Sequence, residues 1–116
     1  MEGKDKDYSP EEVSSVILGQ LRELADAKLG QTTKDCVITV PTYFNDQQRA
    51  ATREAGKLAN FNVLKIANEA VAAATAYELD KNGQNTLIFY YGGSTIDVTI
   101  LSKKGGKFET KANKFD

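Results

Sequence analysis

The first two-thirds of the chain alternates between helix-like and strand-like spacing of apolar residues. Ser9-Pro10-Glu11-Glu12 is typical of a helix start, because Ser9 can cap the helix and Glu12 can return a hydrogen bond to the cap. Apolar residues then recur at helical spacing until Gly30, which predicts a helix that ends there. Further along, the pattern predicts strands at 36–40 and 62–66, and small-faced helices that begin after Asn45 and span 69–79.

The residues after Gly83 have a different character, dominated by β-branched and aromatic side chains. They predict a β-meander of three strands, with turns at Gly92-Gly93-Ser94 and at 104–107. Apolar residues occupy both alternating sets of positions in the first two of these strands. A sheet that is apolar on both faces needs cover on both sides, so we expect one face to lack a partner within this chain.

Composition narrows the possible functions. The chain has 116 residues, 27% of them charged, and a formal net charge of -1, which does not suit a nucleic-acid-binding protein. Histidine is absent and Cys36 is the only cysteine, which argues against histidine catalysis, most transition-metal sites and an intramolecular disulfide. We expect Cys36 to be a buried small hydrophobe. No apolar run approaches the ~20 residues of a membrane span and no signal peptide opens the chain, so a soluble, intracellular, cytoplasmic protein is expected, with an organelle left open.

The run from Tyr90 to Asp97 carries the candidate chemistry. Backbone N–H groups around Gly92 and Gly93 could hold a phosphate, since glycine allows close approach to the main chain. Thr95 could add a hydroxyl donor, and Asp97 could orient water around a metal-bound nucleotide. A plain hairpin with a glycine turn has the same spacing, and on spacing alone it is the favoured interpretation.

Four segments, in order along the chain, resemble signatures of the seventy-kilodalton heat-shock chaperone family: 8–15, 40–49, 68–77 and 92–97. The resemblance implies an α/β fold that is a partial domain of an actin-like (ribonuclease H-like) ATPase, with two lobes around a nucleotide cleft. It divides the chain into a flexible leader at 1–8, a helix–strand portion of the first lobe at 9–80, and a β-meander at 81–116 that opens the second lobe.

The same resemblance implies a site for ATP or ADP with magnesium. Glu69 matches a residue near the magnesium and its waters, and Asp97 matches an acidic residue at the reaction centre. The remaining matched positions are nucleotide-binding (Gly92, Gly93, Ser94 and Thr95) or tied to interlobe switching (Pro41, Arg49 and Lys65, the last an arginine in most of the family). No residue is predicted to ligate a metal directly.

Several departures from the family pattern argue against catalysis. Tyr90 replaces an aspartate that helps to position the attacking water, and tyrosine carries no negative charge near neutral pH. Ser94 replaces a third glycine, which would restrict the backbone if that position needs a positive φ. The first phosphate loop, its catalytic lysine and the adenosine-binding segment have no counterpart. We therefore expect a fragment or derivative of a chaperone ATP-binding domain that does not hydrolyse ATP by itself and binds nucleotide weakly or not at all.

Two questions stay open on the sequence alone. One alternative function is a non-enzymatic scaffold or interaction module, engineered or degenerate, that retains the core of the fold. The second question is assembly: we expect a homodimer through the β-meander, either by edge pairing or by exchange across the loop at 80–84, with a collapsed monomer as the alternative. The resemblance adds co-chaperones or the remainder of the ATPase domain as partners, and neither nucleic acid nor a membrane is expected.

Overall fold

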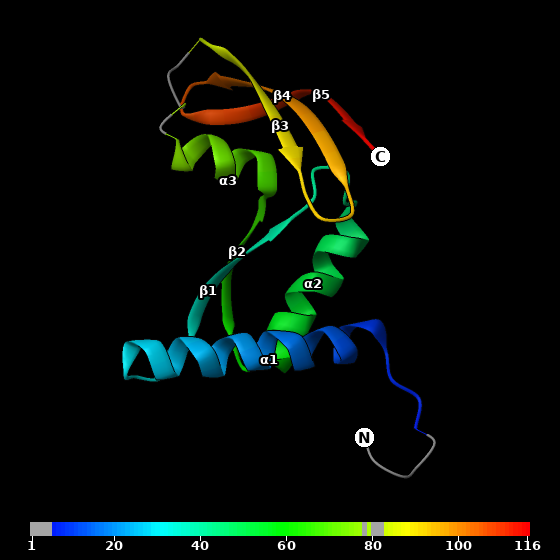
Figure 1. Ribbon diagram of the computed structural model, residues 1–116, viewed down its shortest axis with the longest axis vertical. Helices are drawn as coiled ribbons and strands as arrows, with labels where there is room; N and C mark the ends of the chain where they lie inside the picture. Colours follow the sequence, from blue (N-terminus) through cyan, green and yellow to red (C-terminus); the bar gives the residue numbers. More distant parts are fainter. Residues whose placement is uncertain (1–5, 78, 80–82) are drawn as a thin grey trace. The chain divides into compact units, whose positions relative to one another are not determined.

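The computed structural model describes residues 6–77, 79 and 83–116. Most of the expected leader and part of the expected exchange loop at 80–84 lie outside these residues. Within these residues the chain is mixed α/β: three helices alternate with strands, and a run of three strands follows (Figure 1). They are α1 (Pro10–Leu29), β1 (Asp35–Val40), α2 (Asp46–Leu58), β2 (Asn62–Asn68), α3 (Glu69–Ala76), β3 (Asn85–Tyr91), β4 (Ile96–Lys104) and β5 (Lys107–Phe115).

The chain forms two compact units. The first comprises the chain up to Ile38 together with Asp46–Ile66, and it contains α1, α2 and most of the two-stranded sheet. The second comprises Thr39–Asn45 and Ala67–Asp116, and it contains α3 and the three-stranded sheet. None of the helices in the described part of the chain is long and apolar enough to cross a membrane.

Both ends of α1 lie where the sequence predicts them. The Ser9 side chain accepts a hydrogen bond from the Glu12 N–H at 3.2 Å, and the Glu12 carboxylate accepts one from the Ser9 N–H at 2.7 Å. Gly30 ends the helix in the left-handed region at φ 67°, a conformation that favours glycine. No residue of α1 is buried, and its apolar stripe remains about half exposed or more: Val13, Val16, Ile17, Leu21 and Leu24.

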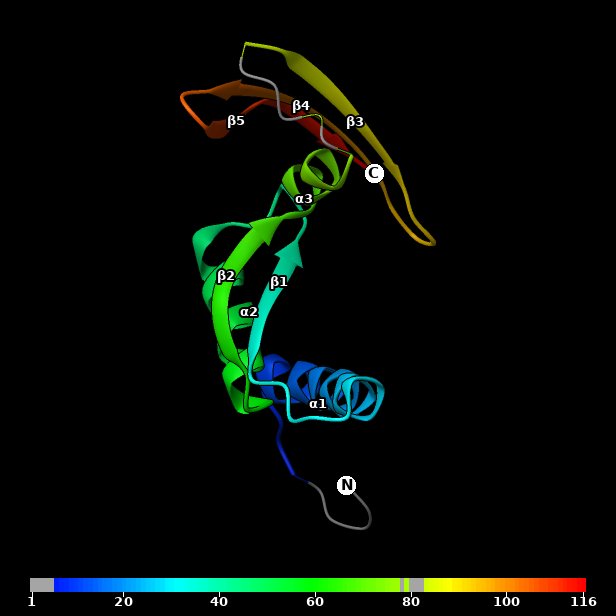
Figure 2. The same ribbon diagram turned by 90° about the vertical axis from the view of Figure 1, so that its left-hand side faces the viewer.

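The first unit packs α2 closely against the two-stranded sheet. β1 and β2 lie side by side and run in the same direction (Figure 2). A Cβ on the buried Gly56 would lie 2.5 Å from a methyl carbon of Val63, so glycine allows this approach. Cys36 on β1 is only half-buried, which corrects the expectation of full burial; partial burial, followed by the charge of Asp35, raises the pKa of its thiol.

The second unit is an antiparallel sheet in the order β3-β4-β5, with α3 packed against one face (Figures 1 and 2). Its core joins Ala70 and Ala74 of α3 to Leu101 of β4, with Val71, Ile88 and Phe108 packed around them. The alanine-rich face lets the helix approach the sheet closely, as predicted.

The helix α3 ends at Ala76, three residues before the end that the sequence pattern predicts. Tyr77 caps it with φ -92° and ψ 9°, and the Leu79 N–H donates to the Ala74 carbonyl at 2.9 Å. This hydrogen bond spans five residues instead of the helical four, so the chain has already left the helix at Leu79.

Candidate functional site

Asp97 is a buried carboxylate on β4, with 8% of its surface exposed. The Thr99 hydroxyl donates to its Oδ1 at 2.7 Å, and the Asn113 side-chain amide donates to its Oδ2 at 2.9 Å. Strand alternation puts Thr99 on the same face as Asp97, and Asn113 lies directly opposite Thr99 on β5. Both carboxylate oxygens therefore have a donor that replaces water.

A second set of hydrogen bonds lies between Thr99 and the start of α3. The Thr42 hydroxyl lies 3.3 Å from that of Thr99 and donates to the Asn68 side-chain oxygen at 2.9 Å. The same oxygen of Asn68 caps α3 by accepting from the Ala70 N–H at 2.8 Å. These contacts bring three segments of the second unit together: Thr42 after β1, Asn68 before α3 and Thr99 on β4.

Glu69 is the first residue of α3 and lies in the electrostatic field of Asp97. Partial burial is the main cause that raises the pKa of the Glu69 carboxyl, and the Asp97 carboxylate adds to the shift. Two like charges near one another disfavour ionisation of one of them. The charge of Asp97 therefore acts on Glu69, the other acidic residue that the resemblance assigns to the site.

The turn from Gly92 to Thr95 joins β3 to β4, and one of its donors is already used. The Gly92 N–H donates to the Thr95 carbonyl at 2.9 Å, so the N–H groups from Gly93 onward are those left for a phosphate. A Cβ on Gly93 would meet no atom within 4 Å, which leaves its backbone open to a ligand. Among the described non-glycine residues only Asn60 has a positive φ, so Ser94 fits its position without the expected restriction.

A hollow of about 370 Å³ lies at this turn, on the face of the sheet opposite Asp97. Its lining residues are Tyr91, Gly92, Gly93, Ser94, Thr95, Ile96 and Asp116. Tyr91 is the cross-strand partner of Ile96, one position from the pair Tyr90 and Asp97. Because side chains alternate between faces along a strand, Tyr91 and Ile96 point to the face opposite Asp97. The hollow and the buried Asp97 carboxylate therefore lie on opposite faces of the sheet, joined only by the Gly92–Thr95 turn. The sequence pattern did not predict that they lie on different faces.

Tyr90 faces the same side as Asp97, because the two residues are direct cross-strand partners. Its ring packs against the turn: a Cβ on Gly92 would lie 3.0 Å from the ring and 3.3 Å from the hydroxyl oxygen. The ring is half exposed. A neutral aromatic side chain therefore fills the space beside Asp97 where the resemblance implies a second carboxylate.

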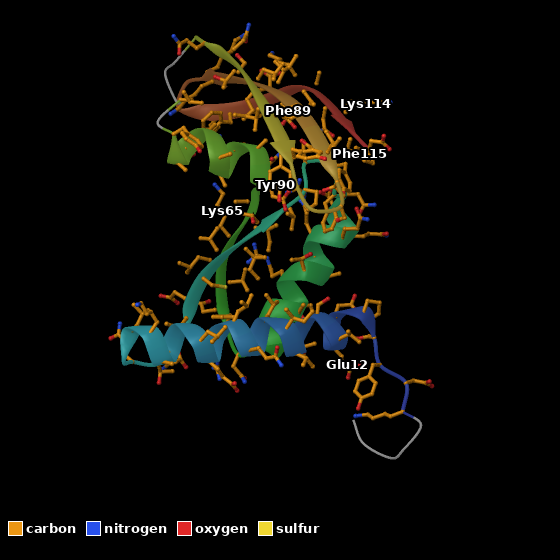
Figure 3. All side chains as sticks on the ribbon, in the orientation of Figure 1. Glu12, Lys65, Phe89, Tyr90, Lys114 and Phe115 are labelled. Carbon is orange, nitrogen blue, oxygen red and sulfur yellow. The ribbon has the colours of Figure 1, made fainter. Side chains whose placement is uncertain are left out.

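The three residues expected to act in switching lie in different compact units. Pro41 follows β1 in the second unit, and its carbonyl accepts from the Phe44 N–H at 3.1 Å. Arg49 is half-buried on α2 and Lys65 is exposed on β2, both in the first unit (Figure 3).

Four polar residues of the site were missed by the sequence analysis: Thr42, Asn68, Thr99 and Asn113. Two of them had a signal, since Asn68 is a common helix cap immediately before a helix and Thr99 shares a strand face with Asp97. Thr42 and Asn113 are placed by tertiary structure, and no local pattern marks them.

Magnesium is the metal that the resemblance implies. The described residues hold no group of three or more potential protein ligands for a metal ion. Mg²⁺ on a nucleotide usually keeps several waters and needs only one or two carboxylates besides the phosphates. Glu69 and Asp97 fit that requirement by charge, and the Asp97 carboxylate acts electrostatically on Glu69.

The alternation of helices and strands and the antiparallel sheet of the second unit define a mixed α/β protein. The family model of the Hsp70 protein matches residues 1–116, so the chain belongs to the Hsp70 family. It is 53% identical to a relative from Homo sapiens named as heat shock 70 kDa protein 7, over 98% of this chain and 32% of the relative. It is 50% and 52% identical to heat shock 70 kDa proteins of Ajellomyces capsulatus and Emericella nidulans, each over 98% of this chain and 17% and 18% of the relative. The chain thus spans a third or less of these relatives.

Proposed function

We propose that this chain is the part of an Hsp70 ATP-binding domain that surrounds the terminal phosphates of ATP, within an actin-like fold, and that it does not hydrolyse ATP by itself. The observation that supports this most is the buried Asp97 carboxylate, held by Thr99 and Asn113 beside Glu69. A carboxylate kept inside a fold with a like charge nearby is costly, and such pairs are typical of sites that handle a cation.

Each part of the site has a role in this proposal. The N–H groups of Gly93, Ser94 and Thr95 would donate to phosphate oxygens, since the turn leaves them outside its own hydrogen bond. Glu69 and Asp97 would hold waters around magnesium. Bound magnesium would neutralise phosphate charge, while Thr99 and Asn113 keep the Asp97 oxygens in place.

Turnover is not expected, because phosphoryl transfer depends on many groups acting together. Tyr90 offers no negative charge to orient an attacking water. The affinity for ATP should also be weak. The contacts of a single turn must offset the ~4–15 kcal/mol that association costs in lost translational and rotational freedom. A scaffold without any nucleotide role is the less favoured function, because the family match extends over the whole chain.

Pro41, Arg49 and Lys65 are proposed to serve interlobe switching, and a cytoplasmic location and co-chaperone partners are proposed by membership of the family alone. Pro41 supports this role best, because Thr42, which follows it, lies 3.3 Å from the Thr99 hydroxyl that donates to Asp97. A change at Asp97 would therefore reach the segment that leads from β1 to α2.

A nuclear magnetic resonance titration of the whole chain with magnesium-ATP tests the proposal. We expect the amide signals of Gly93, Ser94 and Thr95 to shift at millimolar nucleotide, together with those next to Asp97. Adenosine with magnesium is the matched control, and it should leave these signals unchanged. Shifts confined to other regions, or equal shifts with adenosine, would contradict the proposal.

A further inference from the structure

Tyr90 brings a neutral hydroxyl group to the edge of the proposed phosphate site. It is the last residue but one of β3 and the direct cross-strand partner of Asp97 on β4. Figure 3 shows Tyr90 on the side of the sheet that faces α3, opposite Phe89. Its side chain therefore lies on the same face as the Asp97 carboxylate, while the neighbouring Tyr91 points to the face of the hollow.

The ring of Tyr90 lies against Gly92, at the start of the turn. A Cβ on Gly92 would be 3.0 Å from a ring carbon and 3.3 Å from the hydroxyl oxygen of Tyr90. A side chain at position 92 would crowd the ring, so glycine allows the ring to lie this close to the main chain. The Gly93 nitrogen is only two covalent bonds from the Gly92 Cα. The Tyr90 hydroxyl therefore lies close to the first N–H group that the turn leaves for a phosphate.

The hydroxyl group of Tyr90 is free to meet a ligand. Tyr90 is 48% exposed, and no hydrogen bond within the described part of the chain uses its hydroxyl. A phenol hydroxyl can donate a hydrogen bond, and an ionised phosphate oxygen is a strong acceptor. A hydrogen bond between the two would therefore run from Tyr90 to the phosphate.

Tyr90 also lies between the two parts of the proposed site. The proposed phosphate meets the N–H groups of the turn at one end and magnesium near Glu69 and Asp97 at the other. Tyr90 has its backbone opposite Asp97 and its ring against the turn, so it spans this interval. An aspartate at position 90 would place a third negative charge here and repel the phosphate, whereas a tyrosine adds a donor without a charge.

We propose that Tyr90 is a phosphate-binding residue, whose hydroxyl donates a hydrogen bond to the phosphate held by the N–H groups of Gly93, Ser94 and Thr95. This inference rests on the proposed function and names a further residue of the same site. Position 90 then helps to hold the phosphate chain and offers no carboxylate to activate water. The ligand is recognised through its phosphates, and its binding depends less on magnesium than it would with an aspartate at position 90.

A nuclear magnetic resonance titration of the full chain with tripolyphosphate at constant ionic strength tests this proposal. The amide signals of Gly93, Ser94 and Thr95 report binding. We expect Y90F to weaken binding about three- to tenfold, because it removes one hydrogen bond to a charged group and keeps the ring. Y91F is the matched control. It also removes one hydroxyl, from a residue that points to the opposite face, and it should bind like the parent.

A second series adds magnesium. Y90D should bind tripolyphosphate more weakly than Y90F when magnesium is absent, because its carboxylate repels the phosphate. Magnesium should restore more of the affinity of Y90D than of Y90F, since the cation offsets that repulsion. A purely structural role of the Tyr90 ring would not produce this difference. Circular dichroism checks that each variant remains folded, which is expected because Tyr90 is half exposed.

The outcomes separate this inference from the proposed function. A parent that binds tripolyphosphate no better than Y90F does overturns the role of Tyr90 and leaves the proposed function in place. Weakening by Y91F as large as that by Y90F also overturns the inference, because the phosphate would then lie on the side of the hollow. A parent whose turn signals shift with neither tripolyphosphate nor magnesium-ATP overturns the proposed function, and this inference with it.

Discussion

At the scale of single residues, the hydrogen-bond donors around Asp97 decide how this carboxylate can stay buried. Thr99 has one hydroxyl proton and gives it to Asp97 at 2.7 Å, while Thr42 gives its own proton to Asn68 at 2.9 Å. The 3.3 Å contact between the two hydroxyl groups is then left without a proton. Thr99 is accordingly the residue on which the Asp97 side of the network depends.

Replacement of Thr99 by valine should lower the free energy of unfolding by about 1–3 kcal/mol, because it removes a donor from a buried carboxylate while keeping the shape of the side chain. T99S retains the hydroxyl and should recover most of that loss. Chemical denaturation of the two variants measures the difference. Equal stability of T99V and T99S would mean that the hydroxyl does not support Asp97.

Glu69 provides a prediction about pH. Its pKa is raised in the folded chain, first by burial and then by Asp97, so the folded state holds this proton more tightly than the unfolded state does. The stability of the parent should therefore fall as pH rises from the ordinary glutamate pKa, about 4.3, through the raised value of the folded state. E69Q carries no charge and should be the more stable chain at neutral pH.

Thermal unfolding of E69Q and the parent across this range checks the effect. The advantage of E69Q should shrink toward acid pH, where the parent is protonated in both states. E23Q, on α1, is the control, and its stability relative to the parent should not follow this pattern. An advantage of E69Q that grows as pH falls would contradict the assignment.

At the scale of elements, local signals predicted most boundaries. The Ser9–Glu12 capping box and Gly30 fixed both ends of α1, because caps depend on neighbouring residues only. The turns at Gly92–Thr95 and at 104–107 likewise separate the strands that the pattern predicted. The end of α3 was predicted too late, since alanine favours helix beyond Ala76 and the stop at Tyr77 has no local glycine or proline to mark it.

The contact between α2 and the two-stranded sheet gives a prediction at this scale. G56A would place a Cβ 2.5 Å from Val63 and 2.9 Å from Ile38, and Val63 is buried and stiff about χ1. We expect a net loss of ~1 kcal/mol or more, even though alanine favours the helix. G19A, on α1, meets nothing within 4 Å and should gain about 0.5–1 kcal/mol.

Chemical denaturation compares G56A and G19A with the parent. The opposite signs separate packing from helix propensity, because the two substitutions are chemically identical. A gain of stability in G56A would show that α2 does not approach the sheet as closely as described.

At the scale of the whole molecule, the sequence predicted the family, whose model matches residues 1–116, but not how the candidate residues are arranged. The charge of Asp97 acts on Glu69, but the hollow at the glycine turn opens on the face of the sheet opposite Asp97. Thr42 and Asn113 reach Asp97's network from 55 residues before it (97 minus 42) and 16 after it (113 minus 97). Such contacts depend on how strands pair and helices dock, which no short pattern records.

The proposed function requires that this chain keeps the phosphate-binding part of an Hsp70 ATP-binding domain without its turnover. A hydrolysis assay with magnesium-ATP, on the parent, D97A and the double variant Y90D/S94G, tests this claim most directly. We predict that phosphate release stays at background for all three, because restoring the family residues at positions 90 and 94 does not supply the other groups that phosphoryl transfer requires. Phosphate release by the parent that rises in proportion to protein concentration and disappears in D97A would contradict the account.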